Sequence, residues 1–307
     1  MIPHWFPNAL QPLRQTLSDP SARTRLLRNG ALAAALFTVL YIVGCFVPEG
    51  FDWNHFFRFG RFPGFWLPWS KPLVGWMNFP TVFALSMIGL LWRTRKYSRS
   101  PLPLVLTLFS FPFFWILHLG NYDCLVVLGL MLLPWGVPLA LLKPHLTAFA
   151  LLANRKWFLA GAIWFAVSLL IWGFWPLTQI NTIITNPAWR EEWIQDISLF
   201  PWGLIAAVPL LWFSRRDEDL LMAAGSLATP HLFPYHFIVL MPALGRMRKR
   251  WMILTWIITW TPLAANWLGP GAWHLGNFAS LCFWCGIYFN RGRKAQTAAP
   301  PPGGAPA

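Results

Sequence analysis

The stretch LALLKPHLTAF, Leu139–Phe149, lies inside an apolar run that extends over residues 123–153. It places a lysine, a proline and a histidine side by side among residues that are almost all hydrophobic. In a soluble domain this pattern is typical of a helix end, whereas in a membrane a buried lysine is costly. The meaning of Lys143 therefore depends on the solvent that surrounds the run.

The composition identifies that solvent as a lipid bilayer. Hydrophobic residues make up 56% of the 307 residues, charged residues make up 11%, and the mean hydropathy is +0.48. Soluble domains carry about a quarter charged residues. Apolar runs of about 17 to 25 residues, long enough to cross ~30 Å of hydrocarbon, recur along the chain. The sequence therefore predicts an all-α fold, a polytopic transmembrane helix bundle.

The formal net charge of +14 comes largely from short basic clusters between the apolar runs. The clusters are RTRLLR at 23–28, RTRKYSR at 93–99, NRK at 154–156, SRR at 214–216, RMRKR at 246–250 and NRGRK at 290–294. Basic loops of this kind mark the cytoplasmic side of a membrane protein. The charge thus indicates membrane topology, and we expect no nucleic-acid partner.

These loops divide the chain into about ten expected spans. The spans are placed near 30–47, 73–92, 102–118, 123–153, 157–176, 199–213, 219–229, 232–245, 251–268 and 272–289. The run 123–153 contains PWGVP and Pro144, so it is one bent passage, a passage with a re-entrant piece, or two short helices. Two crossings there would require 219–245 to cross only once and would put SRR outside. We prefer the topology that keeps every basic cluster, and both termini, in the cytoplasm.

Three parts are expected along the chain. Residues 1–29 form a cytoplasmic segment, residues 30–289 a single transmembrane domain, and residues 290–307 a disordered cytoplasmic tail rich in Pro, Ala and Gly. No cleavable signal peptide is expected, because the basic N-terminal segment leads into an ordinary hydrophobic helix. The expected location is the inner (cytoplasmic) membrane of a cell.

Three polar clusters fall on the outer side in this topology. They are residues 48–66 with Asp52, His55, Arg58 and Arg61, residues 118–123 with His118, Asn121 and Asp123, and residues 229–237 with His231, Tyr235 and His236. On a regular helix Asp52, His55 and Phe59 share one face. The same clusters also suit structural roles: an interfacial amphipathic helix, a helix cap and a hydrogen-bonded turn between prolines.

Metal and cofactor chemistry find little support in the sequence. No pair of the outer histidines stands at i, i+4 on one regular helix, so we expect no metal site. The four cysteines, which include CxxC at 282–285, give neither a zinc pattern nor a disulfide framework. The sequence contains no Walker A loop, HExxH motif or GxSxG elbow, and we expect no cofactor.

Lys143 is the charge that is hardest to place in a membrane. A lysine at mid-depth marks a functional site by default, because it must pair, face water or reach the surface. The structural alternative is a lysine that binds backbone carbonyls freed by Pro144. We expect Lys143 to face a polar cavity that suits an anion such as a lipid phosphate. His145 should point about 100° away around the helix and need not share that role.

Four stretches stand in a suggestive order: GFDWNHFF at 50–57, LGNYDCLVVLGLMLL at 119–133, LALLKPHLTAF at 139–149 and SLATPHLFPYHFIVLMPAL at 226–244. Over about residues 30–245 this order resembles the C superfamily of membrane glycosyltransferases, in particular glycosyltransferase family 87, the polyprenyl-phosphate-mannose-dependent type. The shared patterns are a G-[QN] pair that opens a span, a K-P pair one helix later, and a small-Pro-x-x-x-x-[YH] stretch near the end.

The resemblance implies a mannosyltransferase-like reaction in which a polyprenyl-phosphate sugar donor enters from the bilayer. An acid in the first outer loop then deprotonates the acceptor hydroxyl. By position, Asp52 is the implied base, Gly120 and Asn121 are the G-[QN] pair, and Lys143 and Pro144 are the K-P pair. The remaining candidate substrate-binding residues are His55, Arg58, Arg61, His118, His231, Tyr235 and His236.

Three functions are thus open at this point. The leading hypothesis is a membrane glycosyltransferase that uses a polyprenyl-phosphate sugar donor and a lipid or glycan acceptor on the outer face. A transporter or flippase of a lipid-linked or anionic solute also fits, since broken helices around a buried cation are typical of transporters. A structural subunit of a membrane complex is the third reading. Membrane lipids are expected partners in all three.

Overall fold

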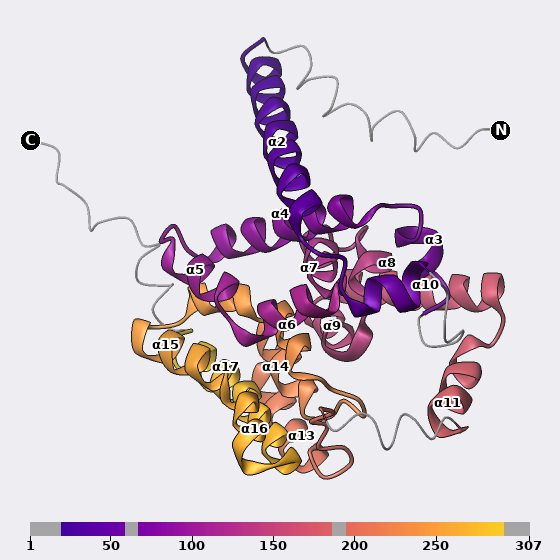
Figure 1. Ribbon diagram of the computed structural model, residues 1–307, viewed down its shortest axis with the longest axis vertical. Helices are drawn as coiled ribbons and strands as arrows, with labels where there is room; N and C mark the ends of the chain where they lie inside the picture. Colours follow the sequence, from indigo (N-terminus) through magenta and orange to yellow (C-terminus); the bar gives the residue numbers. More distant parts are fainter. Residues whose placement is uncertain (1–19, 59–66, 186–194, 292–307) are drawn as a thin grey trace, which may run out of the picture.

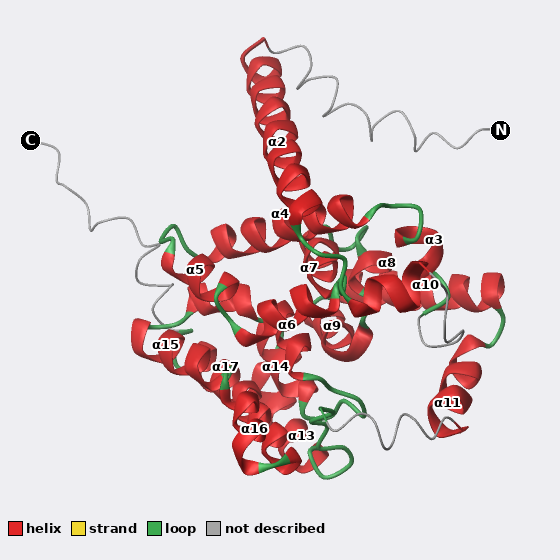
Figure 2. Cartoon of the chain, in the orientation of Figure 1, coloured by secondary structure: helices red, strands yellow, loops and turns green. Residues whose placement is uncertain are grey.

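The computed structural model describes residues 20–58, 67–185 and 195–291. Within these ranges every regular element is a helix, which confirms the all-α prediction (Figure 2). The expected segment 1–29 and tail 290–307 fall mostly outside the described residues. Helix α2 (Pro20–Phe46) begins ten residues before the expected span, so the basic cluster RTRLLR belongs to the helix.

Two helices are long and apolar enough to cross a membrane, α2 and α10 (Arg155–Trp172). A third candidate forms if α5 (Leu102–Leu108) and α6 (Phe111–Leu119), which meet at a bend of 44°, count as one span. In the described ranges the ten regular spans expected from hydropathy are therefore not found. α2 projects from the rest of the fold in Figure 1, where its C-terminal part packs on α4 (Phe79–Tyr97).

Prolines break the expected spans. A proline occupies the first or second position of helix after helix, because its missing N–H is no loss in the first turn. The run 123–153 accordingly forms α7 (Asp123–Met131), α8 (Val137–Ala140), α9 (Pro144–Ala150) and the short η2 (Leu151–Ala153). The run is thus a series of short segments rather than one continuous helix.

The expected spans 219–229 and 232–245 form the centre of the fold. α14 (Glu218–Ser226) is buried along almost its whole length, and so are the 3-10 segments η3 (Pro234–Val239) and η4 (Met241–Arg246). Hydropathy did not separate these segments from lipid-facing spans, because a helix buried in protein is as apolar as one in lipid. The other elements are η1 (Trp53–Arg58), α3 (Ser70–Val74), α11 (Trp175–Thr185), α13 (Leu204–Ser214), α15 (Lys249–Ile258), η5 (Thr261–Ala264), α16 (Ala265–Leu268), η6 (Pro270–Asn277) and α17 (Phe278–Tyr288).

Charged side chains gather near the C-terminal end of α4 in what we call the ionic cluster. Its members are Arg93, Asp217, Glu218, Asp219, Arg246 and Arg291. The fully buried Arg93 donates from Nη2 to Asp219 Oδ1 at 2.7 Å, and Arg246 bonds to both Asp217 and Asp219. Four of the basic loops supply or adjoin these residues, so these loops lie on one face of the fold.

The opposite end of α4 lies beside the segment that carries Asp52 and Trp53. Phe79, at the start of α4, packs edge-on against Trp53, with ring centroids 5.4 Å apart. Arg93 lies fourteen residues further along the helix, which corresponds to about 21 Å at 1.5 Å per residue. The loop that carries Asp52 and the ionic cluster are therefore at opposite ends of one helix.

Candidate functional site

The segment that carries Asp52 passes directly over the turn between α6 and α7. Gly120 caps α6 with a left-handed backbone (φ 68°), a conformation that favours glycine. A Cβ atom on Gly120 would lie 2.5 Å from the backbone nitrogen of Gly50, and a Cβ on Gly50 would collide with Gly120 in turn. The two glycines thus permit a close backbone contact that brings the next residues of both segments together.

Asp52 and Asn121 meet at this crossing. Asn121 Nδ2 donates to Asp52 Oδ2 at 2.8 Å, while Asn121 Oδ1 accepts from the backbone N–H of Tyr122 at 2.7 Å. Burial raises the pKa of Asp52 from 3.8 to about 7, and Asp123 adds to this rise, whereas Lys143 and the bond from Asn121 oppose it. Asp52 is therefore a carboxyl group that gains and loses its proton near neutral pH.

Lys143 stands just before α9 and is buried. Its Nζ lies 3.6 Å from Asp123 Oδ2, and 5.7 and 5.8 Å from the ring centres of Tyr122 and Tyr235. The carbonyl freed by Pro144 belongs to Ala140, and the Thr147 hydroxyl donates to it at 2.6 Å. The structural alternative assigns this carbonyl to Lys143. Because Thr147 already binds it, Lys143 is not needed for that role.

His236 completes the surroundings of Asp123. The backbone N–H of Phe233 donates to His236 Nδ1 at 3.1 Å, so a neutral imidazole carries its proton on Nε2. His236 Nε2 in turn lies 3.7 Å from Asp123 Oδ1. Both oxygens of Asp123 make no hydrogen bond with the described residues. Asp123 is therefore a buried carboxylate flanked by two N–H donors just beyond hydrogen-bond length.

Two further histidines adjoin this group. The ring of His145 stacks on His236 at 4.5 Å, and the ring of His231 lies 5.7 Å from His145. His145 was expected about 100° around the helix from Lys143, but Lys143 precedes α9 with φ −134°, so regular helix geometry does not relate the two, and His145 lies beside His236. His231 Nδ1 lies 2.6 Å from Asp196 Oδ2.

Asp196 keeps its charge despite partial burial. Burial raises its pKa, but the bonds from His231 and from the backbone N–H groups of Leu232 and Ser198 outweigh that effect and hold the pKa below the ordinary 3.8. The Asp196–His231 pair is also more exposed than Asp123 and His236. This pair forms the edge of the site. We call the group of Asp52, Asn121, Asp123, Lys143, His145 and His236 the polar centre.

Other predicted site residues do not join the polar centre. His55 stacks on Phe51 at 4.0 Å and approaches its carbonyl oxygen. Residues 53–58 form a π-helical turn, so the regular α-helix on which Asp52, His55 and Phe59 were expected to share a face is not present there. His118 is exposed and packs near Trp115. Arg58 ends the π-helical turn, but its side chain lies outside the described part of the chain, as do Arg61 and Phe59.

The sequence did not single out Asp123, His145 or Asp196 as site residues. A signal for Asp123 was present, since it is an acid at the start of the apolar stretch DCLVVLGLMLL, and acids at such positions are rarely without a role. Asp196 gave no comparable signal, because its partner His231 is 35 residues away in the chain.

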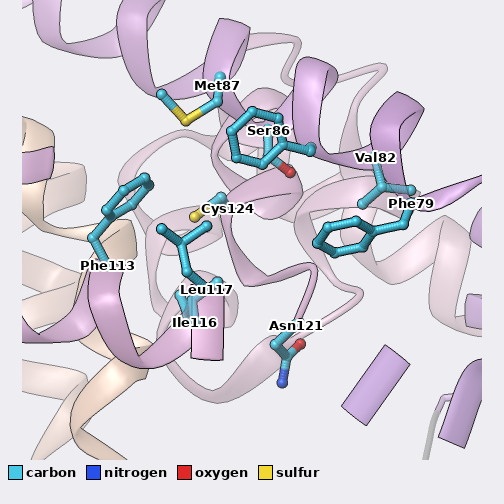
Figure 3. Close-up of a pocket in the computed structure, with 10 residues that line it drawn as sticks. Phe79, Val82, Ser86, Met87, Phe113, Ile116, Leu117, Asn121 and Cys124 are labelled. Carbon is cyan, nitrogen blue, oxygen red and sulfur yellow. The ribbon is translucent and has the colours of Figure 1, made fainter. Parts of the chain in front are cut away.

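An apolar pocket borders the polar centre at Asn121. It has a volume of about 330 Å³, open space at its mouth included, and its walls come from α4, α6 and α7. Figure 3 shows Asn121 at one end, apart from Phe113, Met87 and the other apolar side chains. Among the described residues no group of three His, Cys, Asp or Glu side chains is arranged to hold a metal ion. The polar centre therefore offers a titrating carboxyl and an ammonium beside an apolar surface.

Comparison of the chain with protein-family models, curated proteins and solved structures finds no match in any of the three. We therefore infer function from the residues and their geometry.

Proposed function

We propose that the chain is a polytopic membrane glycosyltransferase that moves a sugar from a polyprenyl-phosphate donor to a lipid or glycan acceptor. In this reaction Asp52 removes the proton of the acceptor hydroxyl, and the acceptor oxygen attacks the anomeric carbon from the side opposite the phosphate. The bond between that carbon and the phosphate oxygen breaks, and its electron pair leaves with the polyprenyl phosphate. Lys143 offsets the charge that develops on the phosphate.

One observation carries this proposal: Asp52, with a pKa of about 7, sits in one buried group with Lys143. A general base works best when its pKa is near the operating pH. Asn121 keeps the carboxylate oriented through its 2.8 Å bond. The apolar pocket beside Asn121 supports the proposal further, because an isoprenoid chain needs an apolar surface close to the phosphate.

The proposed topology has about ten passages, several of them broken, in an inner membrane with both termini in the cytoplasm. The ionic cluster supports a single cytoplasmic side, since it draws four basic loops to one face. Asp52 is at the other end of α4 and would then face the outer side, where polyprenyl-phosphate sugars and acceptors meet. Broken helices are compatible with this arrangement, because irregular backbone is tolerated in a membrane where protein covers it.

The test is transfer of a radiolabelled sugar by the purified chain in proteoliposomes that contain polyprenyl-phosphate mannose and a lipid acceptor mixture. We expect Lys143→Met to reduce transfer by about two to three orders of magnitude, because the phosphate loses its counter-charge. Lys156→Met is the matched control, since Lys156 is exposed in the first turn of α10. Equal transfer by both variants would exclude Lys143 from the reaction.

The Asp123–Lys143 pair also favours a second candidate, a transporter of an anionic solute. Buried ionisable pairs between broken helices mark ion and substrate paths in transporters. Accumulation of a labelled anion in sealed proteoliposomes, with no new glycosidic bond in the lipid fraction, would favour this candidate over transfer.

A further inference from the structure

The ion pair between Lys143 and Asp123 has two unequal partners. The Lys143 side chain retains 10% exposure and ends on a flexible four-carbon stem, whereas the Asp123 side chain is 1% exposed. Asp123 is the first residue of α7, which packs closely on α4. An anion that reaches the polar centre can therefore draw the ammonium of Lys143 toward itself, while Asp123 cannot follow.

The other groups that face Asp123 cannot replace the lysine charge. His236 from η3 is held with its proton on Nε2, so it can donate a hydrogen bond but remains neutral. Tyr122 and Tyr235 contribute neutral rings, and Asp52 from the first outer loop contributes a like charge or none. The first turn of α7 adds the partial positive charge of a helix N-terminus, which is weaker than an ammonium.

A carboxylate that loses its counter-ion in such a place is strongly destabilised. Breaking a buried ion pair leaves an uncompensated charge, and a buried group in that position takes up or loses a proton to become neutral. For Asp123 the neutral form is the carboxylic acid, which can also donate a hydrogen bond. Its two oxygens make no hydrogen bond with the described residues in the resting arrangement, so a proton meets no donor at hydrogen-bond distance.

We propose that Asp123 is the exchangeable counter-ion of Lys143, so that the site binds a phosphate anion together with one proton. This inference rests on the proposed function, because it assumes a phosphate group at Lys143. In the exchange, the ammonium passes from the carboxylate to the phosphate, and a proton from water forms an O–H bond on Asp123. The net charge of the site does not change, since one negative charge enters with the ligand and one is neutralised.

The exchange predicts proton uptake on binding and a defined pH dependence. Farnesyl-phosphate-linked mannose is a suitable probe, because its phosphodiester keeps a single negative charge through the neutral range. Titration calorimetry of the purified full chain in buffers of different ionisation enthalpy should give about one proton taken up per ligand. In the pH range where each bound ligand brings one full proton, the affinity for the probe should fall about tenfold for each unit by which the pH rises.

Two variants identify the proton acceptor. Asp123→Asn should bind the probe at least as tightly as the wild type, with no proton uptake and no such pH dependence. Asp52→Asn should keep the uptake, because Asp52 is not the partner of Lys143. Infrared difference spectra of the wild type should gain a protonated-carboxyl band on binding, a measurement that does not depend on the folding of any variant.

Other results would overturn the inference. Binding without proton uptake, or uptake that is lost in Asp52→Asn and kept in Asp123→Asn, excludes Asp123 as the exchangeable counter-ion while leaving the proposed function intact. A wild-type chain that does not bind the probe contradicts both the proposed function and the coupling.

Discussion

The buried carboxyl of Asp52 should make the stability of the protein depend on pH in a direction that Asp52→Asn abolishes. The pKa of Asp52 is about 7 in the fold, against an ordinary 3.8. At about 1.4 kcal/mol per pKa unit, this difference amounts to about 4 kcal/mol. Below pH 3.8 both the folded and unfolded states hold the proton, and the charge of Asp52 costs nothing. Between 3.8 and about 7 only the folded state holds it, so the free energy of unfolding falls as the pH rises.

The assay is thermal unfolding in detergent, followed by tryptophan fluorescence from about pH 4 to about pH 8, a range that brackets the folded pKa of Asp52. The asparagine side chain introduced by Asp52→Asn keeps an oxygen that can accept the bond from Asn121, so the variant should fold as the wild type does. The melting temperature of the variant minus that of the wild type should therefore be roughly 8 °C larger at the alkaline end of this range than at the acid end, at about 2 °C per kcal/mol. The same variant should lose about two to four orders of magnitude in transfer.

Asp196→Asn is a control, because the charge of Asp196 makes the free energy of unfolding depend on pH in the opposite direction. The pKa of Asp196 lies below 3.8, so the stability that its charge contributes is present above that value and is lost as the pH falls through the folded pKa. Parallel melting curves for wild type and Asp52→Asn over the whole pH range would refute the argument, and so would a gap that widens toward acid pH.

Further predictions concern the backbone crossing, the ionic cluster and the topology. Gly120→Ala should destabilise the fold by more than about 1 kcal/mol in thermal unfolding, because its Cβ would lie 2.5 Å from the Gly50 backbone nitrogen at a left-handed φ of 68°, whereas Gly30→Ala in α2, where a Cβ meets nothing within 4 Å, should cause no loss. Equal losses would mean that the close approach of Gly50 and Gly120 is unimportant. Asp219→Asn should lower stability by about 3–5 kcal/mol, since it removes the buried negative charge that pairs with both Arg93 and Arg246 and leaves Arg93 only Glu218, 3.4 Å away, as a charged partner; a loss below about 1 kcal/mol in chemical denaturation would contradict this. In a chain whose native cysteines are replaced by serine, Lys71→Cys should react with an impermeant thiol reagent in intact cells and Arg99→Cys should not. Labelling of the second alone would invert the topology.

The sequence predicted the helical class well, because this class depends on composition and on short-range pattern. The basic clusters around Arg93 and Arg246 were recognised as loops of one side, and both arginines belong to the ionic cluster. The sequence did not reveal that the acids at 217–219 pair with them, since Arg93 and Asp219 are 126 residues apart. Pairing over such a separation follows from tertiary packing and leaves no local signature.

The regular spans expected from hydropathy are not found where apolar residues serve the protein core. Residues 219–245 read as two membrane passages but form α14 and the short segments η3 and η4, which other helices cover. Proline gave a usable signal here, because Pro234 and Pro242 each stand at the start of a 3-10 segment.

The candidate site was predicted in part. Asp52, Asn121, Lys143 and His236 were assigned to one site from four separate stretches, and the structure brings them together in the polar centre. Their roles remain predictions. Asp123 was placed in the same outer polar cluster as Asn121 but was given no role, because only the three-dimensional arrangement reveals its position between Lys143 and His236.

The pairing of Arg93 with Asp219 also has a consequence for biosynthesis. At a translation rate of about 5–20 residues per second, roughly 6–25 s pass between the synthesis of Arg93 and that of its partner. During this interval the nascent chain holds a helix whose arginine has no counter-ion from α14. Anionic lipid headgroups at the ribosome side of the membrane are suited to neutralise it until α14 arrives. A chain that terminates before residue 217 never acquires this partner, and its shortened lifetime in a pulse-chase experiment would reveal the dependence.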